Sequence, residues 1–163
     1  RTKPMTRRSI LFAVLGAAVL AFSVSACGGS DGGSTASKEE YIASVVTARD
    51  RVDFALSRIT KAKSQEEFLN RMNEASAAID GAASELEGEG VLEGYEDETE
   101  KLTKALHQLS VDLEATAHDI AQPEFAGLAG GAQGLNFESW DQANLALAAL
   151  IADGFKVQLI GNH

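Results

Sequence analysis

The sequence predicts an all-α fold, an antiparallel four-helix bundle with an extended C-terminal tail. Apolar residues recur three and four positions apart in four separate segments, which is the spacing of one face of an α-helix. Breaks that contain glycine, serine or proline separate these segments. The single cysteine excludes a disulfide within the chain. We therefore expect the four apolar faces to form one common core that stabilises the fold.

The first helix is expected over residues 38 to 62. Ser37 and Glu40 have the spacing of a capping box, in which each side chain accepts a hydrogen bond from the backbone N–H of the other residue. The apolar stripe consists of Tyr41, Val45, Ala48, Val52, Ala55 or Leu56, and Ile59.

The second helix is expected to follow after a very short turn, with Ser64 and Glu67 as another capping box. Its stripe consists of Phe68, Met72, Ala75, Ile79, Ala82 or Ala83, and Leu86. Because the connection is so short, the first two helices should be antiparallel neighbours.

The third helix is expected between a glycine-containing break at 87 to 94 and Pro123, which cannot extend a helix. Its stripe consists of Tyr95, Leu102, Leu106, Leu109, Leu113, Ala117 and Ile120. The glycine-rich residues 124 to 136 that follow are interpreted as a partly ordered loop, because no strand leads into them and no Lys-Ser or Lys-Thr pair follows, as a phosphate-binding loop would require.

The fourth helix is expected to begin near Ser139, with Gln142 as the second member of a capping box, and to stop at Asp153 and Gly154. Its stripe consists of Trp140, Ala143, Leu147, and Leu150 or Ile151. Beyond it, Phe155, Val157 and Leu159 alternate with polar residues, which indicates an extended tail along the bundle. The domain is therefore expected to span residues 38 to 163.

The N-terminus has the pattern of a signal peptide over residues 1 to 26, with the true start at Met5. Arg7 and Arg8 precede an apolar run from 10 to 22, which is shorter than the roughly 20 residues that a spanning helix needs. The segment Val24 to Cys27 then matches the lipobox, an aliphatic residue and two small residues before a cysteine. In these residues the chain resembles bacterial lipoprotein precursors.

The resemblance implies that Cys27 is the lipidation site, carrying a thioether-linked diacylglyceryl group with acyl chains such as palmitate, and that cleavage precedes it. The protein would then be anchored to the extracytoplasmic face of a cell membrane, and residues 27 to 37 would hold the lipidated cysteine and a flexible Gly/Ser spacer. Residues 6 to 11 also match a twin-arginine export motif, so the export route stays open between two systems. Inner or outer membrane stays open as well.

The charge of the expected mature chain excludes one class of partner. Residues 27 to 163 hold ten Lys and Arg against twenty-four Asp and Glu, a net charge of −14. Such a surface repels phosphate backbones, so no nucleic acid is expected as a partner. The membrane is a partner through the lipid anchor at Cys27.

Few residues suggest site chemistry. His107, Glu114 and His118 share one helical face and are the weak candidates for a metal, but this face lies beside the leucine stripe and is interpreted as solvated. The carboxylates between 85 and 100 could attract calcium, yet they lack the EF-hand spacing and suit the start of a helix. Phe137 and Trp140 could line a ligand groove, although aromatic residues at helical spacing more often belong to a core.

The sequence accordingly predicts a non-catalytic, membrane-tethered helical lipoprotein that acts through contacts with an unidentified envelope or surface protein or through envelope organisation. No catalytic residue, cofactor or metal is expected. The alternative is a ligand-binding lipoprotein that presents an interhelical groove to a small apolar ligand, a peptide or a cation. A cavity lined by apolar groups with a few polar ones would favour the alternative, and a solid core the first function.

Overall fold

The computed structural model describes residues 36 to 121 and 136 to 161. The chain divides into two compact units, residues 1 to 31 and residues 32 to 163, and the described residues belong to the second. The proposed signal peptide, the lipobox with Cys27 and most of the proposed spacer and glycine-rich loop lie outside the described residues. The described hydrophobic core lies entirely in the second unit, so this unit should fold without the first.

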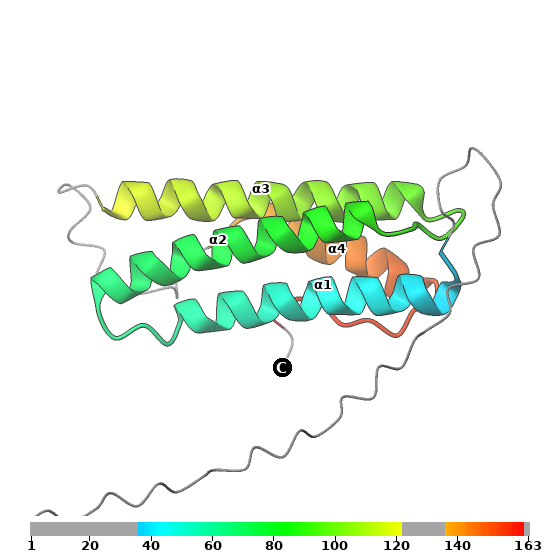
Figure 1. Ribbon diagram of the computed structural model, residues 1–163, viewed down its shortest axis with the longest axis horizontal. Coiled ribbons are helices and arrows are strands. Elements are labelled where there is room, and N and C mark those ends of the chain that lie inside the picture. Colours follow the sequence, from blue (N-terminus) through cyan, green and yellow to red (C-terminus); the bar gives the residue numbers. More distant parts are fainter. Residues whose placement is uncertain (1–35, 122–135, 162–163) are drawn as a thin grey trace, which may run out of the picture. The chain divides into compact units, whose positions relative to one another are not determined.

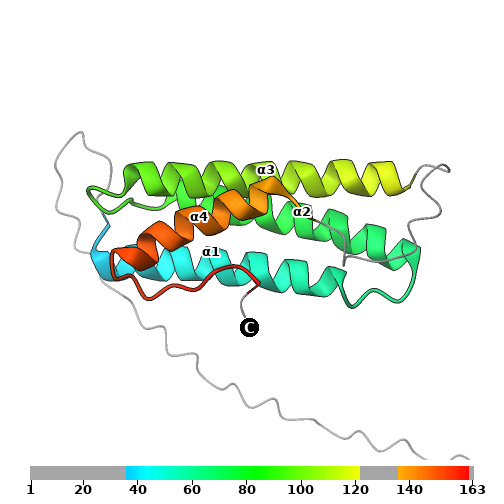
Figure 2. The ribbon, with the colours of Figure 1, turned by 180° about the vertical axis from the view of Figure 1, so that it is seen from behind.

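Four helices follow one another along the described chain: α1 (Lys38–Ile59), α2 (Gln65–Gly88), α3 (Glu96–Ile120) and α4 (Glu138–Ala152). Figures 1 and 2 show that consecutive helices run in opposite directions, with α2 between α1 and α3 and with α4 packed against α3 from behind. The predicted antiparallel four-helix bundle is therefore confirmed. Within the described residues, no helix combines the length and apolarity needed to cross a membrane.

The expected stripes form the core, which confirms the helical periodicity. Both alternatives are buried at Ala55 and Leu56 and at Ala82 and Ala83, because a bundle core is wider than one line of residues. In α4, Leu150 is buried and Ile151 is exposed. Four of the stripe residues are only partly buried, and these are Phe68, Tyr95, Ile120 and Trp140.

The start of α1 has the predicted capping box. The Glu40 N–H donates to Ser37 Oγ over 3.3 Å, and the Ser37 N–H donates to Glu40 Oε2 over 2.9 Å. The predicted end at residue 62 is wrong, since α1 stops at Ile59 and Thr60 is its C-cap. Lys61 and Ala62 donate to carbonyls three residues back, which is the tighter geometry of a helix end.

The expected capping box of α2 is only half present. Ser64 Oγ accepts from the Glu67 N–H over 3.1 Å, as predicted. The Glu67 carboxylate, however, accepts from the Lys63 N–H over 2.7 Å instead of from Ser64, and it also pairs with Arg71.

The expected capping box of α4 is wrong. The helix begins at Glu138, and its N-cap Phe137 makes no side-chain capping bond. Ser139 is buried and donates its hydroxyl to Asp112 of α3, so this side chain ties two helices together and is not available to cap its own.

The end of α4 has the predicted glycine stop in the form of a Schellman motif. Gly154 has a φ of +86°, a left-handed conformation that glycine adopts without strain. The Gly154 N–H donates to the Ile151 carbonyl and the Phe155 N–H to the Leu150 carbonyl, both over 3.0 Å. The chain thereby reverses direction and enters the tail.

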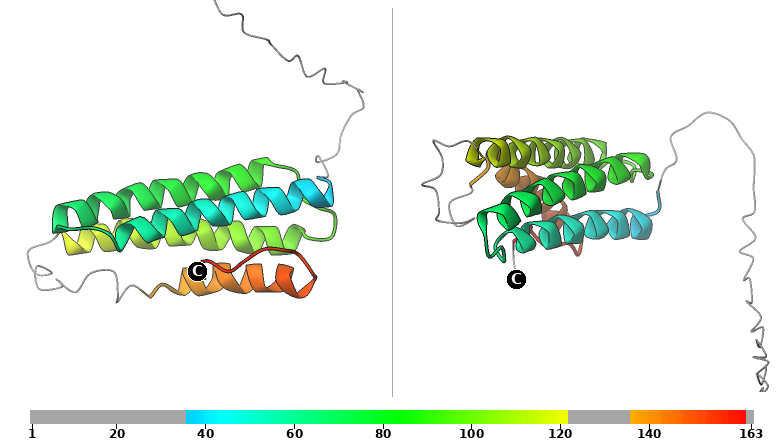
Figure 3. Two further views of the ribbon diagram at one scale, coloured as in Figure 1. Left: turned by 90° about the horizontal axis from the view of Figure 1, so that it is seen from below. Right: turned by 60° about the vertical axis from the view of Figure 1, so that its left-hand side comes forward.

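The tail, residues 155 to 161, runs back between α4 and α1, as the views from behind and from below show (Figures 2 and 3). Phe155 packs edge-on against two tyrosine rings, 4.8 Å from that of Tyr95 and 5.9 Å from that of Tyr41 between centroids. Val157 and Ile160 are also buried. The predicted extended tail along the bundle is therefore confirmed.

Candidate functional site

Three side chains hold the end of the tail against the bundle. Arg49 donates from Nε and Nη2 to the Leu159 carbonyl over 3.1 and 2.7 Å. Asn144 of α4 donates to the Ile160 carbonyl over 3.3 Å and accepts from the Ile160 N–H over 2.8 Å. Asp53 Oδ1 accepts from the Gly161 N–H over 2.8 Å. The tail therefore has a fixed position as far as residue 161.

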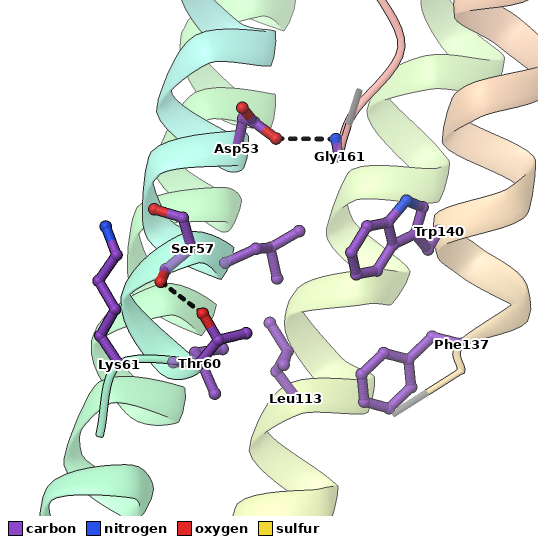
Figure 4. A pocket seen from close by; sticks show the side chains of 10 residues that line it. Asp53, Ser57, Thr60, Lys61, Leu113, Phe137, Trp140 and Gly161 are labelled. Atoms are coloured by element: carbon purple, nitrogen blue, oxygen red, sulfur yellow. Dashed lines mark hydrogen bonds between the residues drawn. The ribbon is translucent and has the colours of Figure 1, made fainter. Parts of the chain in front are cut away.

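A groove of about 420 Å³ lies where the tail ends, between the second half of α1 and the first turn of α4. We call it the α1–α4 groove. Ten residues line it: Asp53, Leu56, Ser57, Ile59, Thr60, Lys61, Leu113, Phe137, Trp140 and Gly161. Figure 4 shows the two aromatic rings on one side and α1 on the other, with Leu113 of α3 between them. Its volume lies in the range of small-molecule sites, roughly 300 to 1,000 Å³.

The apolar wall of the groove is held in place by the backbone of the tail. Gly161 has a φ of +81°, and a Cβ added to it would lie 3.0 Å from Cζ2 of Trp140. The indole ring therefore packs closely on the glycine backbone, and a side chain at position 161 would require the ring to shift by a few tenths of an ångström. This contact fixes the ring from the side of the tail.

Three polar side chains of the groove already have partners on the protein. Asp53 is buried, and its second carboxylate oxygen lies 3.8 Å from Nη2 of Arg49. The Ser57 hydroxyl donates to the Phe54 carbonyl over 2.8 Å, and the Thr60 hydroxyl donates to the Ser57 carbonyl over 2.9 Å. The site thus combines an apolar wall with a few fixed polar atoms, the arrangement that small-molecule sites have in general.

A second hollow, of about 730 Å³, lies between α3 and α4 and is larger but more polar. Its charged side chains interact mostly with groups on the protein itself: Lys101 lies 3.9 Å from Glu98, Lys104 pairs with Glu100, and Asp112 accepts from Ser139. A groove of exposed ion pairs is a common surface feature, since such pairs contribute little and stay hydrated. The α1–α4 groove is therefore the better candidate site.

The three candidate metal ligands do not form a common site. His107 Nδ1 lies 2.8 Å from Asp80 Oδ1 and its Nε2 lies 3.3 Å from Glu87 Oε1, so both ring nitrogens face carboxylates of α2. His118 lies 3.6 Å from Asp119. Across residues 36 to 121 and 136 to 161, no group of three His, Cys, Asp or Glu side chains is arranged to hold a metal ion.

The hydrogen bond with Asp80 raises the pKa of His107, because the carboxylate favours the protonated ring. Partial burial opposes this effect, and Glu87 adds to it. The sequence prediction of a solvated flank therefore needs a correction: His107 is half-buried and links α3 to α2.

The carboxylates between 85 and 100 are divided among separate partners. Glu85 lies 2.7 Å from Arg51, and Glu87 contacts His107. Glu96 accepts from the Gly94 N–H over 2.9 Å, beside the N-terminus of α3 where negative charge is favoured. These contacts are those of surface charge and helix ends.

Sequence reasoning missed five residues of the groove: Asp53, Ser57, Thr60, Lys61 and Gly161. Asp53 is a buried carboxylate directly after the stripe residue Val52, and Arg49 four residues earlier was the available signal for a pair. Nothing in the sequence places Gly161 against an indole ring 21 positions earlier. The sequence does indicate Phe137 and Trp140 as possible groove residues, and the structure brings them together there.

Comparison with known proteins adds no relative: no family model, no curated protein and no solved structure matches this chain.

Proposed function

We propose that this protein is a non-catalytic lipoprotein, tethered by Cys27 to the extracytoplasmic face of a membrane, that binds a small apolar ligand in the α1–α4 groove. Of the two functions expected from the sequence, this is the alternative. The observation that carries it is the groove of about 420 Å³ with an aromatic wall. The tether is supported by the lipobox and the short apolar run before it.

The groove favours binding over catalysis because of what its carboxylate does. Asp53 is its one carboxylate, and this group holds the end of the tail and lies beside Arg49. A general base needs a free lone pair within reach of a substrate proton. The Asp53 carboxylate instead has a structural role.

Contacts with an envelope protein, the first function expected, would use the outer surface. Phe54, Val111 and Leu145 are exposed apolar side chains on three different helices. Single exposed apolar residues are normal on monomeric proteins and do not by themselves mark an interface. The groove is the more specific feature.

An uncharged apolar dye tests the proposal on soluble protein of residues 32 to 163. N-phenyl-1-naphthylamine gains fluorescence in an apolar site and accepts energy from tryptophan, and Trp140 is the only tryptophan of the chain. We expect one dye per protein with a dissociation constant below about 1 mM, which corresponds to about 4 kcal/mol. Excitation of Trp140 should produce dye emission, because the ring lines the groove.

A matched pair of variants locates the dye. Ser57→Phe places a large ring in the groove, and Ser44→Phe makes the same change elsewhere on α1, at another half-buried serine that donates to its own helix. Ser57→Phe should abolish binding and Ser44→Phe should keep it, with the circular dichroism spectrum unchanged in both. Equal binding by the two variants, or no binding by the unmodified protein, would overturn the proposal.

A further inference from the structure

Gly161 connects the tail to both sides of the α1–α4 groove. Its N–H donates to Asp53 Oδ1 of α1 over 2.8 Å. A Cβ added to it would lie 3.0 Å from Cζ2 of Trp140 in the first turn of α4. All three residues line the groove, and Figure 4 shows Gly161 between the carboxylate and the indole ring. The end of the tail is therefore part of the wall of the site.

The end of the tail is held less firmly than its beginning. Phe155 is buried and packs against two tyrosine rings. Gly161 is exposed and has no side chain to bury, so the hydrogen bond with Asp53 and the contact with Trp140 place it. A segment with few buried apolar contacts opens locally at a much lower cost than the whole fold. We therefore expect the tail to open first at Gly161.

Such an opening would change the groove itself. When Gly161 leaves, the groove loses one wall, and the indole ring of Trp140 loses the backbone on which it packs. A ligand that lies against this ring then has fewer contacts, so it binds the open form more weakly than the closed form. A ligand that prefers one of two forms shifts the equilibrium toward that form. Occupation of the groove should therefore keep the tail in place.

We propose that residues 159 to 161 form a strap that closes the α1–α4 groove, and that Asp53 is the positioning residue that holds the strap closed. Ligand binding and closure of the strap stabilise each other, and opening of the strap releases the ligand. Asp53 acts through the Gly161 N–H, and for this role it needs a hydrogen-bond acceptor. This inference rests on the proposed function and adds how the site opens.

Amide hydrogen exchange tests the coupling between strap and ligand. It is measured by NMR on residues 32 to 163, with and without N-phenyl-1-naphthylamine. A ligand that binds only the closed form reduces the open fraction by the factor 1 + [L]/Kd, which is about ten when nine tenths of the sites are occupied. The amides of Ile160 and Gly161 should therefore exchange about ten times more slowly with the dye.

The Ala36 amide is the internal control for this measurement. It donates to the Val91 carbonyl over 3.3 Å, and like the strap amides it lies outside the helices. Ala36 precedes α1, whereas the groove lies along the second half of that helix. Its exchange should stay the same when the dye binds.

Two substitutions test the role of Asp53. Asp53→Ala removes the acceptor, and without dye it should speed exchange of the Gly161 amide about three- to tenfold, as the loss of one net hydrogen bond implies. Asp53→Asn keeps an acceptor oxygen without the charge, and it should restore most of the protection. Asp50→Ala is the matched control, because it removes another carboxylate beside Arg49, 2.8 Å from Nη1, that does not line the groove. It should leave the exchange of the Gly161 amide unchanged.

The outcomes separate this inference from the proposed function. If the dye binds but the amides of Ile160 and Gly161 exchange as fast as before, or if the Ala36 amide slows equally, the inference fails while the binding function stands. It also fails if Asp53→Asn or Asp50→Ala speeds exchange as much as Asp53→Ala. If the dye does not bind, both fail.

Discussion

Truncation of Leu109 at the centre of α3 tests the fold on which the groove depends. Leu109 is fully buried, so Leu109→Ala removes three carbon groups from a site that solvent does not reach. The transfer term alone is about 2.4 kcal/mol at about 0.8 kcal/mol per carbon group. The cavity left behind adds to this loss, and similar truncations cost about 2–5 kcal/mol in total. We therefore expect the free energy of unfolding to fall by that amount.

Leu145→Ala is the matched control, because it makes the same chemical change on α4 where the side chain is 62% exposed. Its expected effect is within about 0.5 kcal/mol of zero. Urea titration of residues 32 to 163, followed by circular dichroism at the helix band, gives both values from the shift of the midpoint at constant slope. A loss below about 0.5 kcal/mol for Leu109→Ala, or equal losses for the two variants, would refute the assignment of the core.

Three further predictions concern the anchor, the interhelical histidine and the end of the tail. Mass spectrometry of membrane-extracted protein should find an acylated N-terminal Cys27 peptide, and Cys27→Ser should release the domain, so a serine variant that stays membrane-bound would count against the tether. A carboxylate of α2 raises the pKa of His107, so the protonated His107 ring stabilises the fold. This stabilisation is complete below about pH 6.5 and is lost as the pH rises through the raised pKa of His107. The urea midpoint should therefore fall more between about pH 6 and about pH 8 in the unmodified protein than in His107→Gln, while the exposed control His118→Gln should keep the full dependence. Gly154→Ala and Gly161→Ala should each cost about 1–2 kcal/mol through backbone strain, but only Gly161→Ala should shift the tryptophan emission, and an unchanged spectrum would contradict the contact.

The helices and their core faces could be predicted from the sequence because both depend on local spacing. A residue at the centre of a stripe, such as Leu109, points toward the core in any packing of the four helices, so its burial follows from periodicity. The end of α4 could be predicted for the same reason. The Schellman motif there depends on one glycine, Gly154, in the left-handed conformation and on hydrogen bonds to the last turn of the same helix.

The errors occurred where a side chain has a choice between a local and a distant partner. Ser139 has the spacing of a helix cap, but its hydroxyl group donates a hydrogen bond to Asp112 of α3 instead. His107 was expected to be solvated, but its two nitrogens meet carboxylates of the neighbouring helix. In both cases the deciding partner is more than 15 residues away in the sequence, so only the packing of the helices identifies it.

The position of the α1–α4 groove follows from the lengths of the elements. At 1.5 Å per residue, the 25 residues of α3 extend about 37 Å and the 15 residues of α4 only about 22 Å. The tail runs back along α4 and at Gly161 reaches the indole ring of the first turn of that helix, so these two elements cover the same stretch of the bundle. Beyond this point α1 continues to Ile59 and α3 continues to Ile120, and among the described elements neither α4 nor the tail fills the space between them. A fourth helix two turns longer would place side chains in that space, and its addition should therefore remove ligand binding while it adds to the stability of the bundle.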